Sequence, residues 1–215
     1  MKKLCLIIFL LAAASLGCKL SGLLPGGGGG SGSGSSSGGA DPKADIVEAS
    51  RKFIALKAFS AKMEGIGQTE IKSQVDYAAP DRFHVRYFAG TGAGIEMIMI
   101  GNQSFMKSGA KWSKMPGDSN ASIPTLRDSF NEEGLKTLTD VKFEGEDTVD
   151  GKPALVYTYK NVTPKGDFPF GSKIWVGKSN GLPIKIVVDY PSGPLKQMTI
   201  NYDTESPVTI EPPIN

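Results

Sequence analysis

Apolar and polar residues alternate with a period of two over most of the chain beyond residue 59, which predicts β-strands. The pattern is clear at Phe83, Val85 and Tyr87, which are separated by charged or imidazole side chains. About five strands are predicted before a helical insert, near residues 59–63, 71–77, 83–87, 95–100 and 104–112. About five more follow it, near 141–143, 155–159, 174–176, 184–189, 198–202 and 208–210. Short turns, such as Gly101-Asn102 and Asp150-Gly151, predict hairpins and hence an antiparallel sheet.

Two helical segments interrupt this alternation. Ile46, Ala49, Phe53 and Leu56 recur at helical spacing behind the start signal Asp41-Pro42, which predicts an amphipathic helix over 42–58. Residues 123–138 predict one or two short helices. Together the elements predict one α+β domain over residues 41–215, long enough to bury a single core.

The first forty residues have a different character. Lys2 and Lys3 precede a nearly unbroken apolar segment, Leu4 to Ala14, which small residues follow. This order is typical of a secretory signal. The apolar segment is shorter than the about 20 residues that a membrane-spanning helix needs.

Ala14-Ser15-Leu16-Gly17-Cys18 then resembles the lipobox of bacterial lipoproteins. In that family the signal is cut before the cysteine, whose thiol and new α-amine are acylated. Ser15 stands where leucine is usual, and the alternative is ordinary cleavage after residues 12–14 to give a soluble exported protein. Cys5 leaves with the signal, so Cys18 has no partner for an internal disulfide. We therefore predict a lipoprotein signal peptide over 1–17 and lipid attachment at Cys18.

Residues 18–40 are dominated by glycine and serine, which predicts a flexible tether between the lipid and the domain. Removal of residues 1–17 takes away two of the 24 basic residues and leaves 22 basic and 22 acidic ones. A neutral mature chain argues against nucleic acid as a partner, because phosphate binding needs a basic surplus. It also argues against attraction to anionic headgroups, so the lipid would hold the protein at the membrane.

Candidate catalytic groups are few. His84 is the one histidine, between Arg82 and Arg86 on the polar side of its strand, where a surface role is commoner than a catalytic one. One cysteine and one histidine cannot form the usual zinc site. The glycine-rich segment 90–94 lacks the Lys-Ser/Thr of a phosphate loop. The acidic pairs 132–133 and 144–146 are of a kind that solvated surfaces often carry. We expect no enzyme, no cofactor and no metal.

The apolar residues, and the methionines in particular, are more informative. Met63, Met97 and Met99 fall on the strand face expected to point inward, together with Met198. Methionine is unbranched and polarisable, so a surface rich in it adapts to flexible apolar guests such as acyl chains. The alternative is that these side chains fill an ordinary core.

Several phrases, in this order, resemble the LolA/LolB and LppX-type carriers of bacterial envelopes. They are YAAPDRFHV, GIEMIMIGNQSFMKSGAKWSKMP, DTVDGKPALVYTY, KIWVGKSNGLPIKI and YDTESPVTIEPP. The resemblance implies a strongly curved antiparallel sheet, an incomplete half-barrel, with helices covering its concave apolar face. It also implies a cavity between sheet and helices for the acyl chains of a lipid or of another lipoprotein.

On this resemblance, the helices 42–58 and 123–138 would form a lid through Phe53, Ile54, Leu126 and Phe130. The candidate lining residues of the cavity are Met63, Ile71, Val75, Phe83, Val85, Ile95, Met97, Met99, Phe105, Trp112, Ile186 and Met198.

The first functional hypothesis is a tethered monomer that carries or accepts acyl chains in the cell envelope. The absence of aspartate after Cys18, where Lys19 stands, favours the outer membrane or outer surface over the inner membrane. The second hypothesis is an envelope lipoprotein with a filled core that binds a protein or senses envelope state. A hydrolase acting on lipid or glycan is the third.

Overall fold

A computed structural model describes residues 39–68, 70–88, 94–116, 130, 132–162 and 169–214. The chain divides into two units, Met1–Ser37 and Gly38–Asn215, and the second contains the elements reported below. The predicted signal peptide, the lipid attachment site Cys18 and nearly all of the tether lie outside the described residues. So do Leu126 and half of the predicted helical region 123–138.

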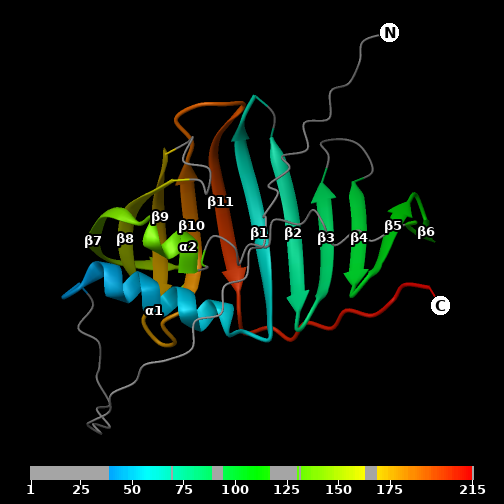
Figure 1. The fold of residues 1–215 in the computed structure, drawn as a ribbon, viewed down its shortest axis with the longest axis horizontal. Coiled ribbons are helices and arrows are strands. Elements are labelled where there is room, and N and C mark those ends of the chain that lie inside the picture. Colours follow the sequence, from blue (N-terminus) through cyan, green and yellow to red (C-terminus); the bar gives the residue numbers. More distant parts are fainter. Residues whose placement is uncertain are drawn as a thin grey trace, which may run out of the picture. The chain divides into compact units, whose positions relative to one another are not determined.

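Eleven strands form one sheet in which every pair of neighbours is antiparallel (Figure 1). Its order is β6-β5-β4-β3-β2-β1-β11-β10-β9-β8-β7, so the first strand of the sequence pairs with the last. The strands are β1 (Ala58–Gly67), β2 (Ile71–Ala78), β3 (Arg82–Phe88), β4 (Ile95–Ile100), β5 (Gln103–Ser108), β6 (Lys111–Lys114), β7 (Thr139–Val149), β8 (Lys152–Val162), β9 (Pro169–Gly177), β10 (Pro183–Asp189) and β11 (Leu195–Asp203).

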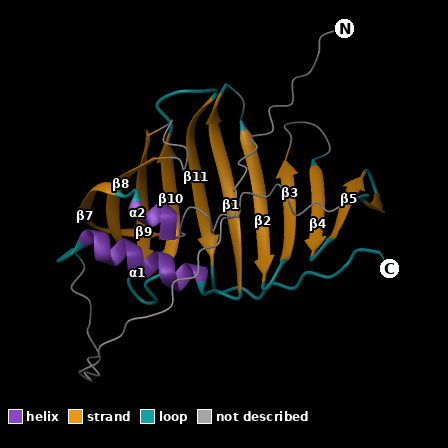
Figure 2. Cartoon of the chain, viewed as in Figure 1, coloured by secondary structure: helices purple, strands orange, loops and turns teal. Residues whose placement is uncertain are grey.

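The sheet is open, with β6 and β7 as its edges, and it is not strongly curled. The antiparallel order is therefore confirmed, whereas the strongly curved half-barrel is not what the structure shows. The described helices are few and short, namely α1 (Pro42–Ile54) and α2 (Glu132–Lys136), so the fold is mostly β rather than evenly α+β (Figure 2). Neither is long and apolar enough to cross a membrane.

α1 begins as predicted and ends earlier. The Asp41 carboxylate accepts a hydrogen bond from the backbone N–H of Ala44 at 3.0 Å, and Pro42 occupies the first turn. The predicted helix over 42–58 stops at Ile54, because Ala58 already pairs with Ala78 in the sheet. The residues predicted as the last helical turn thus connect α1 to β1, which begins at Ala58.

The predicted last strand over 208–210 is wrong. Residues 204–214 contain no strand, although Ile210 is buried. Prolines at 207, 212 and 213 lack the backbone N–H that a strand ladder requires, which explains why the alternation of apolar side chains persists without a strand.

The register of the strands divides the side chains between two faces, since cross-strand partners point to the same side. We call the face that packs against α1 the inner face and the opposite one the outer face. The main core lies on the inner face, between α1 and the sheet. Its buried apolar residues are Ile46, Ala49, Phe53, Phe59, Ala61, Tyr77, Phe130, Leu135, Leu138, Tyr157, Ile174, Val176, Ile186 and Tyr202.

Candidate functional site

One part of the inner face is an aromatic cluster, which we define as Phe53, Phe59, Tyr77, Phe83, Phe130 and Tyr202. The ring centroid of Phe53 lies 4.8 Å from that of Phe59, 4.9 Å from that of Phe130 and 4.9 Å from that of Tyr202. Tyr77 continues the cluster to Phe83 at 5.2 Å. The cluster fills the space between α1 and the sheet with the protein's own side chains.

This packing corrects the prediction of a lid above a vacant space. Phe53 is completely buried and Phe130 nearly so, which makes both core residues. Ile54 is half-buried against the same core. The aromatic rings around Phe53 therefore occupy the space that such a lid would leave vacant.

Polar contacts hold α1 on the sheet. The Tyr157 hydroxyl donates to a carboxylate oxygen of Asp45 at 2.8 Å, and the backbone N–H of Gly39 donates to the same oxygen at 3.0 Å. Burial, and then the Asp45 carboxylate, raise the pKa of Tyr157, so its hydroxyl keeps the proton that this bond uses. The Lys43 ammonium donates to the carbonyl of Leu138 at 3.1 Å and links α1 to the segment after α2.

A second part of the inner face is lined by methionine and valine. We define the methionine strip as Met63, Val75, Val85, Met97, Met99 and Met198. Val75 pairs with Val85, which pairs with Met97, while Phe83 pairs with Met99 and so joins the strip to the aromatic cluster. Val75, Val85 and Met99 are buried, whereas Met63, Met97 and Met198 are half-buried.

Apolar side chains at one end of the strip are exposed to solvent. Tyr87 and Ile95 are cross-strand partners that are 44% and 51% exposed, and Ile71 is 37% exposed. All three share the inner face with the strip. Isolated exposed apolar residues are normal, but this group continues a buried apolar surface to its edge.

Ten of the twelve predicted lining residues lie on the inner face, as their cross-strand partners show. They are Met63, Ile71, Val75, Phe83, Val85, Ile95, Met97, Met99, Ile186 and Met198. Ile186 belongs to the main core beneath the helices. The other nine lie on β1 to β4 and β11, where they are neighbours across the sheet.

Phe105 and Trp112 are on the outer face, which corrects their prediction as lining residues. Phe105 pairs with Ile98, and Lys107 pairs with Trp112. The two-residue turn at Gly101-Asn102 sets this register, because it pairs Ile100 with Gln103 and hence Met99 with Ser104. Counting outward from that turn places Phe105, whereas Trp112 depends on a second turn at Gly109-Ala110, which pairs Ser108 with Lys111 and hence Lys107 with Trp112.

The C-terminal segment covers these outer-face residues. Ile210 packs with Ile98 and Phe105, with Val208 and Trp112 beside them. The Arg82 guanidinium donates to the carbonyl of Ile210 at 2.6 Å and lies 3.5 Å from the Glu211 carboxylate. Of the strands that carry the methionine strip, β4 is thus packed from the opposite side through Ile98.

His84 lies in a network of charged side chains on the outer face. One ring nitrogen lies 2.8 Å from Glu96, and the other lies 3.8 Å from Asp76, which also binds Arg86. The Lys107 ammonium lies 2.7 Å from Glu96. The hydrogen bond from Lys107 lowers the pKa of Glu96 most, against burial and with help from His84. These side chains form a charged network that links strands β2, β3, β4 and β5.

Glu144 and Glu146 do not form a two-carboxylate site. A bulge between Phe143 and Gly145 breaks the alternation, so Glu144 accepts from the Thr158 hydroxyl at 2.7 Å while Glu146 binds Lys178 at 2.7 Å. The side chains at 132 and 133 lie outside the described residues. Within the described ranges, no group of three His, Cys, Asp or Glu side chains is arranged to hold a metal ion.

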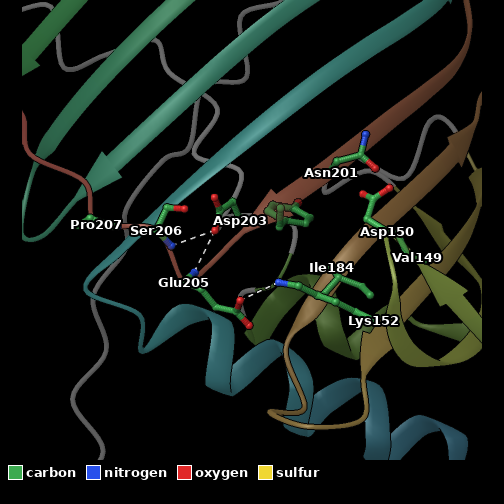
Figure 3. A pocket seen from close by; sticks show the side chains of 10 residues that line it. Val149, Asp150, Lys152, Ile184, Asn201, Asp203, Glu205, Ser206 and Pro207 are labelled. Atoms are coloured by element: carbon green, nitrogen blue, oxygen red, sulfur yellow. Dashed lines mark hydrogen bonds and ion pairs between the residues drawn. The ribbon is translucent and has the colours of Figure 1, made fainter.

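The described residues line two hollows that bear on the site. The larger, of about 520 Å³, is lined by Val149, Ile184 and Pro207 and by charged and polar groups that include Asp150, Asn201 and Asp203, with an ion pair between Lys152 and Glu205 at 2.7 Å (Figure 3). Such walls do not suit an acyl chain. The smaller, of about 50 Å³, lies on the inner face and is lined by Phe130, Tyr159, Asn161, Phe170, Ser172, Ile186, Val188, Ile200 and Tyr202. Sequence reasoning missed Tyr159 and Ser172, because nothing in a strand pattern distinguishes them.

Comparisons with known proteins concern the fold. No family model matches the sequence, and no curated protein matches it. The structure is similar to the lipoprotein LppX of Mycobacterium tuberculosis, with 17% identity, a TM-score of 0.60, and coverage of 79% of this chain and 98% of that one. It is similar to LprF from Mycobacterium bovis, with 14% identity, a TM-score of 0.61, and coverage of 83% and 100%. The chain therefore has an LppX-like fold, as the resemblance in the sequence predicted.

Proposed function

We propose that this chain of LppX-like fold binds the acyl chains of a lipid, or of another lipoprotein, and carries or accepts them in the bacterial cell envelope. The observation that supports this function is the methionine strip. Its side chains form a connected apolar surface that ends at the exposed residues Ile71, Tyr87 and Ile95. Flexible thioether side chains suit a guest that has no fixed shape.

The strip, rather than the space beneath α1, is the place for the guest. The aromatic cluster already occupies the region under the helix, whereas Met63, Met97 and Met198 keep part of their surface exposed. Each methylene that moves from water onto such a surface contributes about 0.8 kcal/mol. We also propose a strongly curved form of the sheet, because that shape would enclose a bound chain.

Transfer on this proposal is passive and needs no enzyme chemistry. A chain leaves one apolar surface for another that matches it better, so no catalytic group, cofactor or metal is required. We further propose that the protein acts as a monomer and is anchored through an acylated Cys18 to the outer membrane or outer surface, with residues 18–40 as the tether. A Cys18→Ala variant should leave the membrane fraction or stall in processing, and membrane association of that variant would contradict the anchor.

The binding function is tested on the full chain, expressed with its signal in a bacterial host. Native mass spectrometry should show co-purified lipid, and a pyrene-labelled alkyl probe should bind the protein after delipidation. Met97→Lys places a charge in the strip and should lower probe binding at least tenfold while the domain stays folded. Thr199→Lys is the matched control, because Thr199 lies on the outer face opposite Glu64. A protein without lipid and without probe binding would overturn the proposal.

The aromatic cluster favours a second candidate, an envelope lipoprotein with a filled core that binds a protein partner. In that case the methionine strip is ordinary core, and Met97→Lys should unfold the domain instead of weakening binding. Circular dichroism of the variant therefore separates the two functions.

A further inference from the structure

A serine hydroxyl is buried in the small inner-face cavity. Ser172 lies on β9 between its cross-strand partners Tyr159 on β8 and Val188 on β10, and it is 5% exposed. Its hydroxyl has no hydrogen-bond partner among the described residues. Buried polar groups nearly always find a partner, so one left over in a cavity wall indicates a missing hydrogen-bonding group.

Two tyrosine hydroxyls belong to the same cavity. Burial raises the pKa of Tyr159 to about 12. The nearby Ser172 hydroxyl has a smaller, opposite effect on this pKa, although the two hydroxyls are not placed to form a hydrogen bond. Burial, and then Tyr159, raise the pKa of Tyr202. Both phenols therefore stay protonated at any physiological pH and can donate hydrogen bonds.

The remaining wall of this cavity is apolar or uncharged. A phosphate or carboxylate group bound there would lie in an apolar setting without a lining cation to balance it, which is costly. A volume of about 50 Å³ is larger than the 10–15 Å³ of such volume that one water needs. The cavity therefore suits a small uncharged group that accepts hydrogen bonds.

A row of cross-strand partners on the inner face leads from the cavity to the methionine strip. Cross-strand pairing places Ser172 beside Val188, Val188 beside Met198, and Met198 beside Gly65, which pairs with Ile71. This row joins the buried hydroxyl to the exposed end of the strip. Gly65 has no side chain, and the Leu195 side chain covers it, since a Cβ there would lie 2.8 Å from a methyl carbon of Leu195. A guest chain that follows this row therefore lies over Leu195 or displaces it.

We propose that Ser172 and Tyr159 bind the ester carbonyl of an uncharged acyl lipid whose hydrocarbon chain lies along the methionine strip. This inference rests on the proposed function and specifies the chemical class of its guest. The carbonyl oxygen accepts from the two hydroxyls, and the chain follows the row from Val188 to Ile71. A free fatty acid in its anionic form is disfavoured, because no cation among the described residues lines the cavity.

The test compares three probes on the full chain: methyl tetradecanoate, heptadecane with the same number of non-hydrogen atoms, and tetradecanoate at pH 8. Each displaces the pyrene-labelled alkyl probe in competition. A hydrogen bond contributes about 1 kcal/mol, or roughly fivefold in affinity, so the ratio of ester to alkane affinity should be about fivefold higher in the wild type than in a variant that lacks one of the two hydroxyls. The anion should bind more weakly than the ester.

Ser172→Ala should weaken ester binding about fivefold and leave alkane binding unchanged. Tyr159→Phe is the second variant, with the same expected loss, in case the first does not fold. Ser104→Ala is the matched control, because Ser104 is a buried inner-face serine on β5, away from the cavity.

The possible failures are distinct. If neither variant changes the ratio of ester to alkane affinity, the cavity merely holds water, and this inference is wrong while the proposed function stands. If no probe binds the wild-type chain, the proposed function itself fails. Tighter binding of the anion than of the ester would also overturn the assignment to an uncharged guest.

Discussion

The aromatic cluster and the methionine strip share one face of one sheet, yet they are packed in opposite ways. α1 covers the sheet next to the cluster and inserts Phe53 among the rings of Phe59, Phe130 and Tyr202. Beneath the strip, the C-terminal segment packs on the outer face instead, where Ile210 contacts Ile98 and Phe105. Both parts of the sheet thus receive apolar cover, but from different sides.

On our proposal, the aromatic cluster stabilises the fold, whereas the methionine strip binds the guest. Rigid rings that fill a space give a well-defined core, whereas unbranched methionines adapt to different neighbours. Because Ile98 buries apolar area on the outer face, β4 does not depend on a filled inner face alone. On our proposal, the inner face of the strip is then available for a guest.

The largest expected effect is at the centre of the cluster. Phe53→Ala should lower the free energy of unfolding by about 3–5 kcal/mol, since it leaves a cavity at a completely buried ring. Met97→Ala in the strip should cost less than about 1.5 kcal/mol, because that side chain is half-buried. Urea unfolding monitored by circular dichroism measures both. Equal losses would mean that the strip is core and that the two parts do not differ.

A smaller effect is expected at the C-terminal cover. Ile210→Ala should lower the free energy of unfolding by about 2–3 kcal/mol, because Ile210 is buried on the outer face. Binding of the pyrene-labelled probe to the folded variant should stay unchanged, since the inner face is intact. Ile214→Ala is the control, as Ile214 is exposed and should cost almost nothing. Loss of probe binding in folded Ile210→Ala would show that the two faces are coupled.

The smallest effect concerns the charged network on the outer face of the same strands. The pKa of Glu96 is lowered from 4.5, first by the hydrogen bond from Lys107. A lowered pKa stabilises the fold above the unfolded value, and the stabilisation is lost as the pH falls from about 4.5 through the folded pKa. Both side chains are partly exposed, so the contribution should be below about 1 kcal/mol.

Glu96→Gln should therefore flatten the dependence of unfolding free energy on pH below 4.5, measured by urea unfolding at several pH values. Lys107→Gln should have the same effect, because it removes the first cause of the shift. An unchanged slope in both variants would show that the network does not stabilise these strands.

Local signals predicted much of the fold correctly. Period-two patterns predict most of the strands, although residues 104–112, expected as one strand, form parts of β5 and β6. Asp41-Pro42 predicts the start of α1, because an N-cap acts over a few residues. The methionines of the strip share one face as predicted, since side-chain direction alternates along each strand. The faces of Phe105 and Trp112 depend instead on the registers of two successive hairpins, which alternation alone does not give.

By itself, the sequence determined the strands, their antiparallel succession and the side on which most apolar residues lie, since each depends on neighbours within a few positions. The tertiary structure alone decided that Phe53 and Phe130 fill the space under α1, that Ile210 covers the outer face, and that the Ser172 hydroxyl lies unpaired in a cavity. These features depend on contacts between residues far apart in the chain, and no local pattern encodes how closely two such surfaces pack.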